Sequence, residues 1–244
     1  MRELIVQAGE NDNISTLYIV DENNKFSGAI DLKDLIIARE NDDLDDLISY
    51  SYPYLLDCEK ISDCIEKIKA LLDYLPDNNL SASPFGGEND DINRTSEVLN
   101  SADTENLDIR TVINEISDAS SVLELSKDFA PNVATALVKL GGESAAVVAA
   151  SGELDIAGCK KASRFVRFAD SFNIPVVTIT NVTGFKADKN EEDANSLASA
   201  AELISAYAEA TTAKIDIIAG SACGGAYLAL GSKYIGSDMT IAWP

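Results

Sequence analysis

Apolar runs and amphipathic stretches alternate through the second half of the chain. Short runs typical of strands lie at 122–125, 145–150, 175–180, 215–219 and 235–243. The segments between and after them that favour a helix are 134–140, 158–172, 194–211 and 224–230. This order predicts an α/β layer architecture, in which helices cover the strands.

The first part of the chain has a different pattern. Residues 15–21 and 26–31 each read as a strand, and the turn residues at 22–25 separate them. An apolar stripe over 32–39 then favours a short helix. The sequence therefore predicts a hairpin followed by a helix.

A longer helix is predicted at 61–74. We expect Ser62 or Asp63 to cap it and Pro76 to end it. Residues that fall on one apolar face of this helix are Ile61, Ile65, Ile68, Leu71 and Leu72. Turn residues crowd 76–93 with little periodicity, which predicts a linker or long loop.

Composition and charge exclude several classes of protein. The 41 acidic and 19 basic residues give a net charge of −22, so binding to nucleic acid or to an anionic membrane through bulk charge is excluded. The chain contains no histidine, which excludes Ser-His-Asp and Cys-His catalysis and histidine-ligated metal within it. Apolar residues make up 46% of the chain, enough for a sizeable core.

The cysteines indicate a reducing compartment. None of Cys58, Cys64, Cys159 and Cys223 forms a CxxC pair. No signal peptide is apparent, and no apolar run approaches the length of a membrane span. We therefore expect a cytoplasmic protein without disulfides.

A strand-to-helix turn at 218–227 is the first candidate site. Its small residues Gly224, Gly225 and Ala226 leave the first amides of the following helix uncrowded. Such amides are unpaired within the helix and lie at the positive end of its dipole, so they suit an oxyanion. The alternative is that the glycines serve packing alone.

The segment Asn181–Phe185 is a second candidate. It follows a predicted strand at the matching end, and ligands of α/β sheets bind outside the carboxyl ends of strands. The alternative is an ordinary loop with Gly184 at positive φ.

Three weaker candidates carry their own alternatives. Cys223 is a nucleophile or a small packed thiol. The acidic cluster Asp42–Asp46 binds Mg²⁺ or Ca²⁺, or it is a solvated turn. A basic helix face contacts the phosphates of a cofactor or forms surface salt bridges. The residues of this face are Lys160, Lys161, Arg164 and Arg167.

Residues from about 65 to 244 resemble the carboxyltransferase subunit of biotin-dependent acyl-CoA carboxylases and decarboxylases. The motifs that carry this resemblance, in order, are Lys69–Asn79, Asp108–Ile113, Ser121–Leu125, Gly152–Asp155, Arg164–Pro175, Tyr207–Thr211, Gly224–Tyr227 and Ala242–Pro244. The resemblance implies a crotonase-like (ClpP/crotonase) ββα spiral domain. It covers the C-terminal half of that subunit and stops before its usual end, so we expect the domain to be truncated and incomplete.

The resemblance also implies an activity and a site. The family transfers a carboxyl group between biotin and an acyl-CoA through an enolate of the thioester, whose oxyanion is held by backbone amides. Gly225 and Ala226 match one of the family's two amide pairs and are implied to be catalytic, without a metal. The residues implied to bind substrate or biotin are Gly184, Phe185, Gly224, Tyr227 and Leu228, of which Leu228 matches a position associated with acyl-chain choice.

Cofactors and partners follow from the same resemblance. They are biotin on a biotin carrier protein, a coenzyme A thioester as substrate, and biotin carboxylase or membrane decarboxylase subunits. The acyl-CoA is of the acetyl-, propionyl- or methylmalonyl-CoA type. We expect a homo-oligomer at full length and no activity from this chain alone. Asn181 stands where many members have aspartate, which suggests a sub-branch nearer the decarboxylases. Cys223 stands where many members have an aromatic residue, so the resemblance does not imply how the wall of the pocket is formed at this position.

Residues from about 10 to 67 resemble part of a cystathionine-β-synthase (CBS) domain of bacterial magnesium transporters. The strand–strand–helix pattern at 15–36 and the segment Ile61–Ile68 carry this resemblance. It implies an alternative function, a regulatory module that senses Mg²⁺ or a nucleotide. The predicted division is a partial CBS-like α+β segment at 1–67, a helix end and linker at 68–105, and the carboxyltransferase domain at 106–244.

Overall fold

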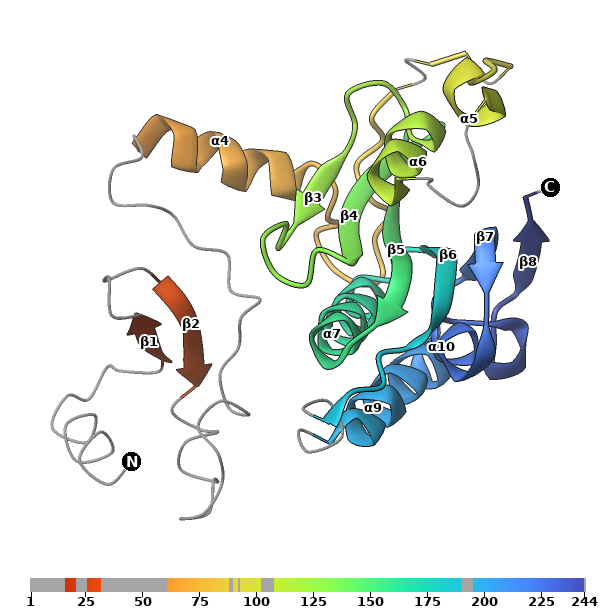
Figure 1. Ribbon diagram of the computed structural model, residues 1–244. Coiled ribbons are helices and arrows are strands. Elements are labelled where there is room, and N and C mark those ends of the chain that lie inside the picture. The colour runs from red at the N-terminus through yellow and green to blue at the C-terminus, as the bar shows by residue number, and fades with distance from the viewer. Residues whose placement is uncertain are drawn as a thin grey trace, which may run out of the picture. The chain divides into compact units, whose positions relative to one another are not determined.

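The computed structural model describes residues 16–20, 26–31, 61–87, 90–91, 93–101, 108–189 and 195–243. The chain divides into two compact units, Met1–Glu59 and Lys60–Pro244 (Figure 1). The domain boundaries drawn from the sequence stay predictions. Within the described ranges, no helix has the length and apolar character needed to cross a bilayer.

The first unit contains the predicted hairpin. Strand β1 (Thr16–Val20) pairs antiparallel with β2 (Phe26–Asp31), with a register shift between Ile19 and Val20. This confirms both predicted strands. The helix expected at 32–39 and the acidic cluster Asp42–Asp46 lie outside the described residues.

A six-stranded sheet forms the frame of the second unit, with its strands in the order β3-β4-β5-β6-β7-β8. The first three strands are antiparallel, and β5 to β8 are parallel. Their bounds are Leu123–Leu125, Val133–Leu140, Glu143–Leu154, Val176–Phe185, Lys214–Ala222 and Met239–Ala242. This sheet confirms the predicted strands of the second half and the mixed α/β class.

Helices connect the parallel strands, as the periodicity predicts. They are α7 (Ile156–Ser171), α9 (Ser196–Glu209) and α10 (Gly224–Ala229), and a 3₁₀ turn η1 (Lys233–Ile235) leads to β8. Helix α7 begins at the cap of Asp155, whose carboxylate accepts from the N–H of Gly158 at 2.7 Å. The strand predicted at 235–243 is shorter than expected, because its first part forms the 3₁₀ turn.

The prediction of a helix at 134–140 is wrong, because these residues form strand β4. Gly141 and Gly142 have φ of 60° and 83°, which suits the tight turn of a hairpin better than a helix end. Asp118 accepts hydrogen bonds from both glycine amides, at 2.9 and 2.7 Å. The strand is buried on both faces from Val133 to Lys139, so it lacks the alternation that marks a strand in sequence.

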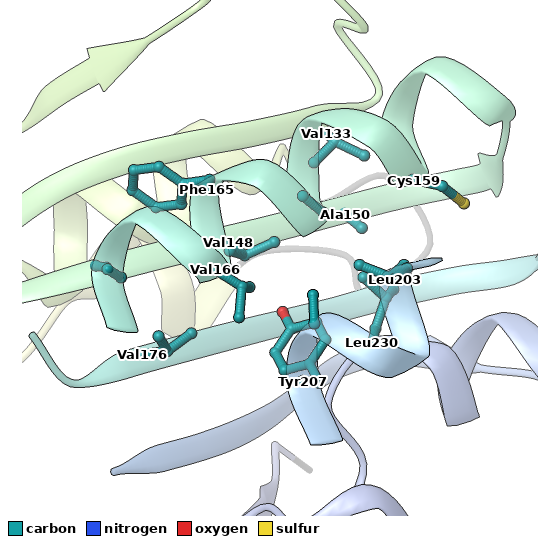
Figure 2. Close-up of a cluster of buried hydrophobic side chains, with 14 of the residues drawn as sticks. Val133, Val148, Ala150, Cys159, Phe165, Val166, Val176, Leu203, Tyr207 and Leu230 are labelled. Carbon is teal, nitrogen blue, oxygen red and sulfur yellow. The ribbon is translucent and has the colours of Figure 1, made fainter. Parts of the chain in front are cut away.

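Two apolar layers enclose the sheet. One packs the sheet against α7, α9 and α10, and Figure 2 shows part of it, with Phe165 and Val166 of α7 over Val148 and Val176 of the strands. The other layer lies against α6 (Ile109–Ile116) and α5 (Glu97–Ser101). Four residues predicted to face inward from α7 are buried, namely Ala162, Phe165, Val166 and Ala169.

Helix α4 (Ile61–Leu72) forms where predicted, but only Leu71 of its apolar face is shown to pack against the core. Ile65, Ile68 and Leu72 are 46%, 53% and 58% exposed. Ser62 and Asp63 lie inside the helix, so the predicted cap is wrong. The periodicity correctly indicates a helix, whereas burial depends on a neighbour that periodicity alone cannot identify.

The segment predicted as a linker packs in part on the sheet. The amide of Gly86 donates to the carbonyl of Gly142 at 2.8 Å, and the ammonium of Lys139 donates to the carbonyl of Pro84. Phe85 lies so close to Gly142 that a Cβ there would come within 2.5 Å of its ring. Residues 84–87 are therefore part of the second unit.

Candidate active site

The two candidate segments meet at one edge of the sheet. Strands β6 and β7 run parallel, with Val182 paired to Ala222, and the amide of Cys223 donates to the carbonyl of Val182 at 3.0 Å. Asn181–Phe185 is the last part of β6 rather than the loop expected from sequence, and Gly184 has φ of 153°. The expectation that both segments lie at the same sheet edge is confirmed.

The turn into α10 leaves three amides before the first helical bond. Cys223 is the N-cap, and the first bond of the helix runs from the N–H of Tyr227 to the carbonyl of Cys223 at 3.5 Å. In the described part of the chain, no acceptor takes the N–H of Gly225 or Ala226. Gly225 is exposed and Ala226 is fully buried, so Gly225 is the more accessible of the pair.

Phe185 lies against the turn. A Cβ added to Gly225 would come within 3.2 Å of its ring, so the end of β6 and the start of α10 are in direct contact. A Cβ added to Gly184 or Gly224 would meet no atom within 4 Å, which leaves open space at both positions. Tyr227 is half-buried and Leu228 is 42% exposed. The geometry thus brings Phe185 and Gly225 together, while the roles of all these residues stay predictions.

Asp216 is a residue of this site that the sequence patterns did not single out. It lies on β7 and is fully buried. The hydroxyl of Thr180 donates to its Oδ1 at 3.2 Å, and the hydroxyl of Tyr227 interacts with the same carboxyl group. Burial raises the pKa of Asp216 to about 6, against the opposing effect of both hydroxyls. The signal in the sequence is a lone acid inside the apolar run 215–219.

This raised pKa predicts a pH dependence of stability. The unfolded chain releases the Asp216 proton near its ordinary pKa, whereas the folded chain retains it to about pH 6. The contribution of Asp216 to the free energy of unfolding therefore falls as the pH rises from about 4 to about 6. Asp216→Asn removes this contribution, so the variant's stability relative to the parent should increase between pH 4 and pH 7. Urea denaturation of both proteins measures it, and a difference that is constant with pH or grows on acidification contradicts it.

Asn181 holds the neighbouring end of β7. Its Oδ1 accepts from the amide of Ser221 at 2.9 Å, and a Cβ added to Gly220 would come within 2.4 Å of this oxygen. We predict that Gly220→Ala lowers the free energy of unfolding by about 1–3 kcal/mol through this overlap. Adding Asn181→Ala removes the obstructing oxygen, so in urea denaturation the double variant should lose less than the sum of the two single losses. Strict additivity contradicts this account.

The basic face predicted on α7 is only partly on the surface. Lys161 is buried, and its ammonium donates to the carbonyls of Phe129 and Val133 at 2.7 and 2.6 Å. Burial lowers the pKa of Lys161 to about 8. Arg167 pairs with Glu209 of α9 at 3.8 Å, in agreement with the salt-bridge alternative. Lys161 is one of the inward positions of the helix, so its assignment to the polar face is wrong.

The cysteine candidate has a clear outcome. Cys223 is an exposed free thiol, so its interpretation as a packed thiol is wrong, because the residue caps α10 at the sheet edge. Among the described residues, no three Cys, Asp or Glu side chains gather in a group that could hold a metal ion.

The mixed sheet with its covering helices and the small-residue turn at the strand ends define an α/β domain with a candidate ligand site at the ends of its parallel strands. The chain belongs to the carboxyl transferase domain family, whose model matches residues 56–244.

Relatives of known activity support this membership. Over 199 residues the chain is 40% identical to the propionyl-CoA carboxylase beta chain of Saccharopolyspora erythraea, covering 75% of this chain and 36% of that one. Over 195 residues it is 38% identical to the methylmalonyl-CoA decarboxylase subunit alpha of Veillonella parvula, covering 76% and 38%. The chain thus spans well under half the length of these curated relatives.

A solved structure agrees with the fold. The chain matches a crystal structure of transcarboxylase 12S with hydrolyzed methylmalonyl-coenzyme A bound, at a TM-score of 0.70 and 37% identity. This match covers 73% of this chain and 37% of that one. It supports the crotonase-like carboxyltransferase fold, and the CBS-like segment stays a prediction.

Proposed function

We propose that the chain is part of a biotin-dependent acyl-CoA carboxylase or decarboxylase and takes part in carboxyl transfer between biotin and an acyl-CoA. The observation that carries this proposal is the exposed turn at Gly225, which has an amide without an acceptor in the described residues and stands beside Phe185. Its position at the ends of two parallel strands is where α/β sheets bind ligands.

The residues at this edge suit a thioester and the biotin that carries the carboxyl group. The N–H of Gly225, with that of Ala226 behind it, would donate to the thioester oxygen as negative charge develops. The open space at Gly184 and Gly224 lets a ligand approach the backbone closely. The side chains of Phe185, Tyr227 and the exposed Leu228 offer apolar contacts to the acyl group of the thioester and to the ring system of biotin. Biotin, when bound, supplies or accepts the carboxyl group.

Substrate and partners are inferred from the relatives. Propionyl-CoA carboxylase and methylmalonyl-CoA decarboxylase are named for substrates of one size class, so we propose an acyl-CoA of the acetyl-, propionyl- or methylmalonyl-CoA type. A biotin carrier protein, and biotin carboxylase or membrane decarboxylase subunits, would complete the enzyme. Transcarboxylase 12S forms a hexamer assembly, which favours a homo-oligomer for the enzyme proposed here. A cytoplasmic location remains part of the proposal.

Ligand-dependent melting tests this proposal on the chain as it stands. Propionyl-CoA at 100 times its Kd should stabilise the native state by about 2.7 kcal/mol. For a domain of this size, that corresponds to an increase in Tm of roughly 5–10 °C. Coenzyme A without an acyl group is the matched control and should give a smaller shift. No shift with propionyl-CoA at millimolar concentration contradicts acyl-CoA binding.

The hairpin of the first unit favours a second candidate function for that unit alone. The antiparallel pair β1–β2 is the arrangement expected of a partial CBS-like segment. We propose that this unit senses Mg²⁺ or a nucleotide. An increase in Tm on titration with MgCl₂ or ATP, but not with NaCl of equal ionic strength, supports this function, and the absence of any shift contradicts it.

A further inference from the structure

Strand β7 carries a bulge just before the candidate site. The register of β6 with β7 steps from Thr180–Ile218 to Val182–Ala222. Residues 219–221 of β7 therefore stand opposite a single residue of β6, Asn181. The strand on the other side of β7 gives this segment no register partner, because the pairing of β7 with β8 ends at Ile218. Bulges are frequent beside active sites, where they redirect the chain.

The side chain of Asn181 fills this bulge. Its Oδ1 accepts a hydrogen bond from the amide of Ser221 at 2.9 Å. A Cβ added to Gly220 would come within 2.4 Å of Oδ1 and 2.8 Å of Cγ, so the backbone of Gly220 packs against the side-chain amide. Asn181 is only 8% exposed, so water cannot easily replace a partner that is lost.

The bulge leads directly into the turn of the candidate site. After it, the amide of Cys223 donates to the carbonyl of Val182 at 3.0 Å, which brings the chain back to β6. Helix α10 is held in the core by other residues, namely the fully buried Ala226, Ala229 and Leu230. Residues 220–223 lack such an anchor, since each of them is half-buried or exposed. The path of the chain into the turn therefore depends on its contacts with β6.

We infer that Asn181 is a positioning residue, which fixes the bulge of β7 and so sets the path of the chain into the turn at Cys223 and Gly224. A site made of backbone amides needs such support, because an amide has no rotamer of its own and points where the chain directs it. Phe185, on the same strand as Asn181, contacts the turn at Gly225. The catalytic meaning of this role rests on the proposed function, whereas the fixing of the bulge does not.

Amide hydrogen exchange of the ¹⁵N-labelled chain tests this inference. Asn181→Ala removes the acceptor, so the amides of Ser221 and Cys223 should both exchange about tenfold faster or more. The amide of Cys223 is the informative one, because its own acceptor on Val182 is unchanged. Asn181→Asp retains an oxygen acceptor of similar shape and should stay within about threefold of the parent. The amide of Leu230 in α10 should keep its parental rate in both variants.

Asn132→Ala is the matched control. The Nδ2 of Asn132 also joins strand ends, with donated bonds to the carbonyl of Glu153 at 3.0 Å and to Oδ1 of Asp155 at 3.1 Å. It acts at the end of β5 and should leave exchange at Ser221 and Cys223 at the parental rate. Faster exchange of Ser221 alone in Asn181→Ala overturns the inference, because the contact is then only local. Equal acceleration throughout the unit also overturns it, since that marks a merely structural role.

Binding of propionyl-CoA separates this inference from the proposed function. Asn181→Ala should raise the Kd for propionyl-CoA by about three- to tenfold, and Asn181→Asp should restore the parental value. If the parent binds propionyl-CoA and Asn181→Ala binds it equally well, the positioning role is wrong and the proposed function stands. If the parent does not bind it while exchange at Cys223 changes as expected, Asn181 still fixes the bulge and the proposed function is wrong.

Discussion

Replacing Gly225 with proline should lower kcat for carboxyl transfer by about 10²–10³-fold in the assembled enzyme, which is the effect of losing one oxyanion donor. Proline has no N–H and is tolerated in the first turn of a helix, where this amide has no helical partner. The change thus removes the proposed donor without removing a bond of α10. Steady-state turnover of propionyl-CoA, or decarboxylation of methylmalonyl-CoA, measures it.

Gly225→Ala is the control for this prediction. It retains the N–H and adds only a Cβ, which would lie 3.2 Å from the ring of Phe185. A small movement of the ring accommodates this atom, so the loss of kcat should be less than about tenfold. Equal losses in the alanine and proline variants would assign the effect to crowding against Phe185 and contradict a role for the amide.

Tyr207→Ala should lower the free energy of unfolding by about 3–5 kcal/mol. Tyr207 is fully buried between α9 and the sheet, as Figure 2 shows, and its hydroxyl pairs with that of Thr178. Its ring also contacts the turn after α10, where a Cβ on Gly231 would come within 2.6 Å of it. The alanine variant leaves a cavity that these neighbours cannot easily fill. Urea denaturation at neutral pH measures the loss.

Tyr207→Phe is the control for this loss. It retains the ring and removes only the hydroxyl, which leaves Thr178 without its partner and should cost about 1–2 kcal/mol. A loss in Tyr207→Ala no greater than in Tyr207→Phe would show that the ring contributes little packing energy. The ring would then not be what joins α9 and α10 to the sheet.

The parallel part of the fold is predictable from sequence, because each element there has a clear period. Strand β6 and helix α7 have the apolar run and the amphipathic stripe that their burial requires. Strand β4, in the antiparallel part of the sheet, is not predictable in this way, because a strand buried on both faces does not alternate and so resembles a helix in sequence. Gly141-Gly142 carries the hairpin signal there, but a glycine pair is equally compatible with a helix end.

The position of the candidate site is predictable from sequence, but the side chains that pack beneath it are not. The two glycine segments could be placed at one sheet edge from strand order alone. Which side chains lie beneath α10 depends on the registers of β6, β7 and β8, which local periodicity does not specify. Asp216 on β7 illustrates this limit, and Lys161 on α7 is a second ionisable residue that the fold buries.

The most direct test of the central claim follows the backbone amides of the ¹⁵N-labelled chain by NMR during titration with propionyl-CoA. If the amide of Gly225, with that of Ala226, donates to the thioester oxygen, both amide protons should move downfield, with smaller changes at Gly184 and Phe185. Saturable binding that perturbs other amides and leaves those of Gly225 and Ala226 unmoved would contradict the claim.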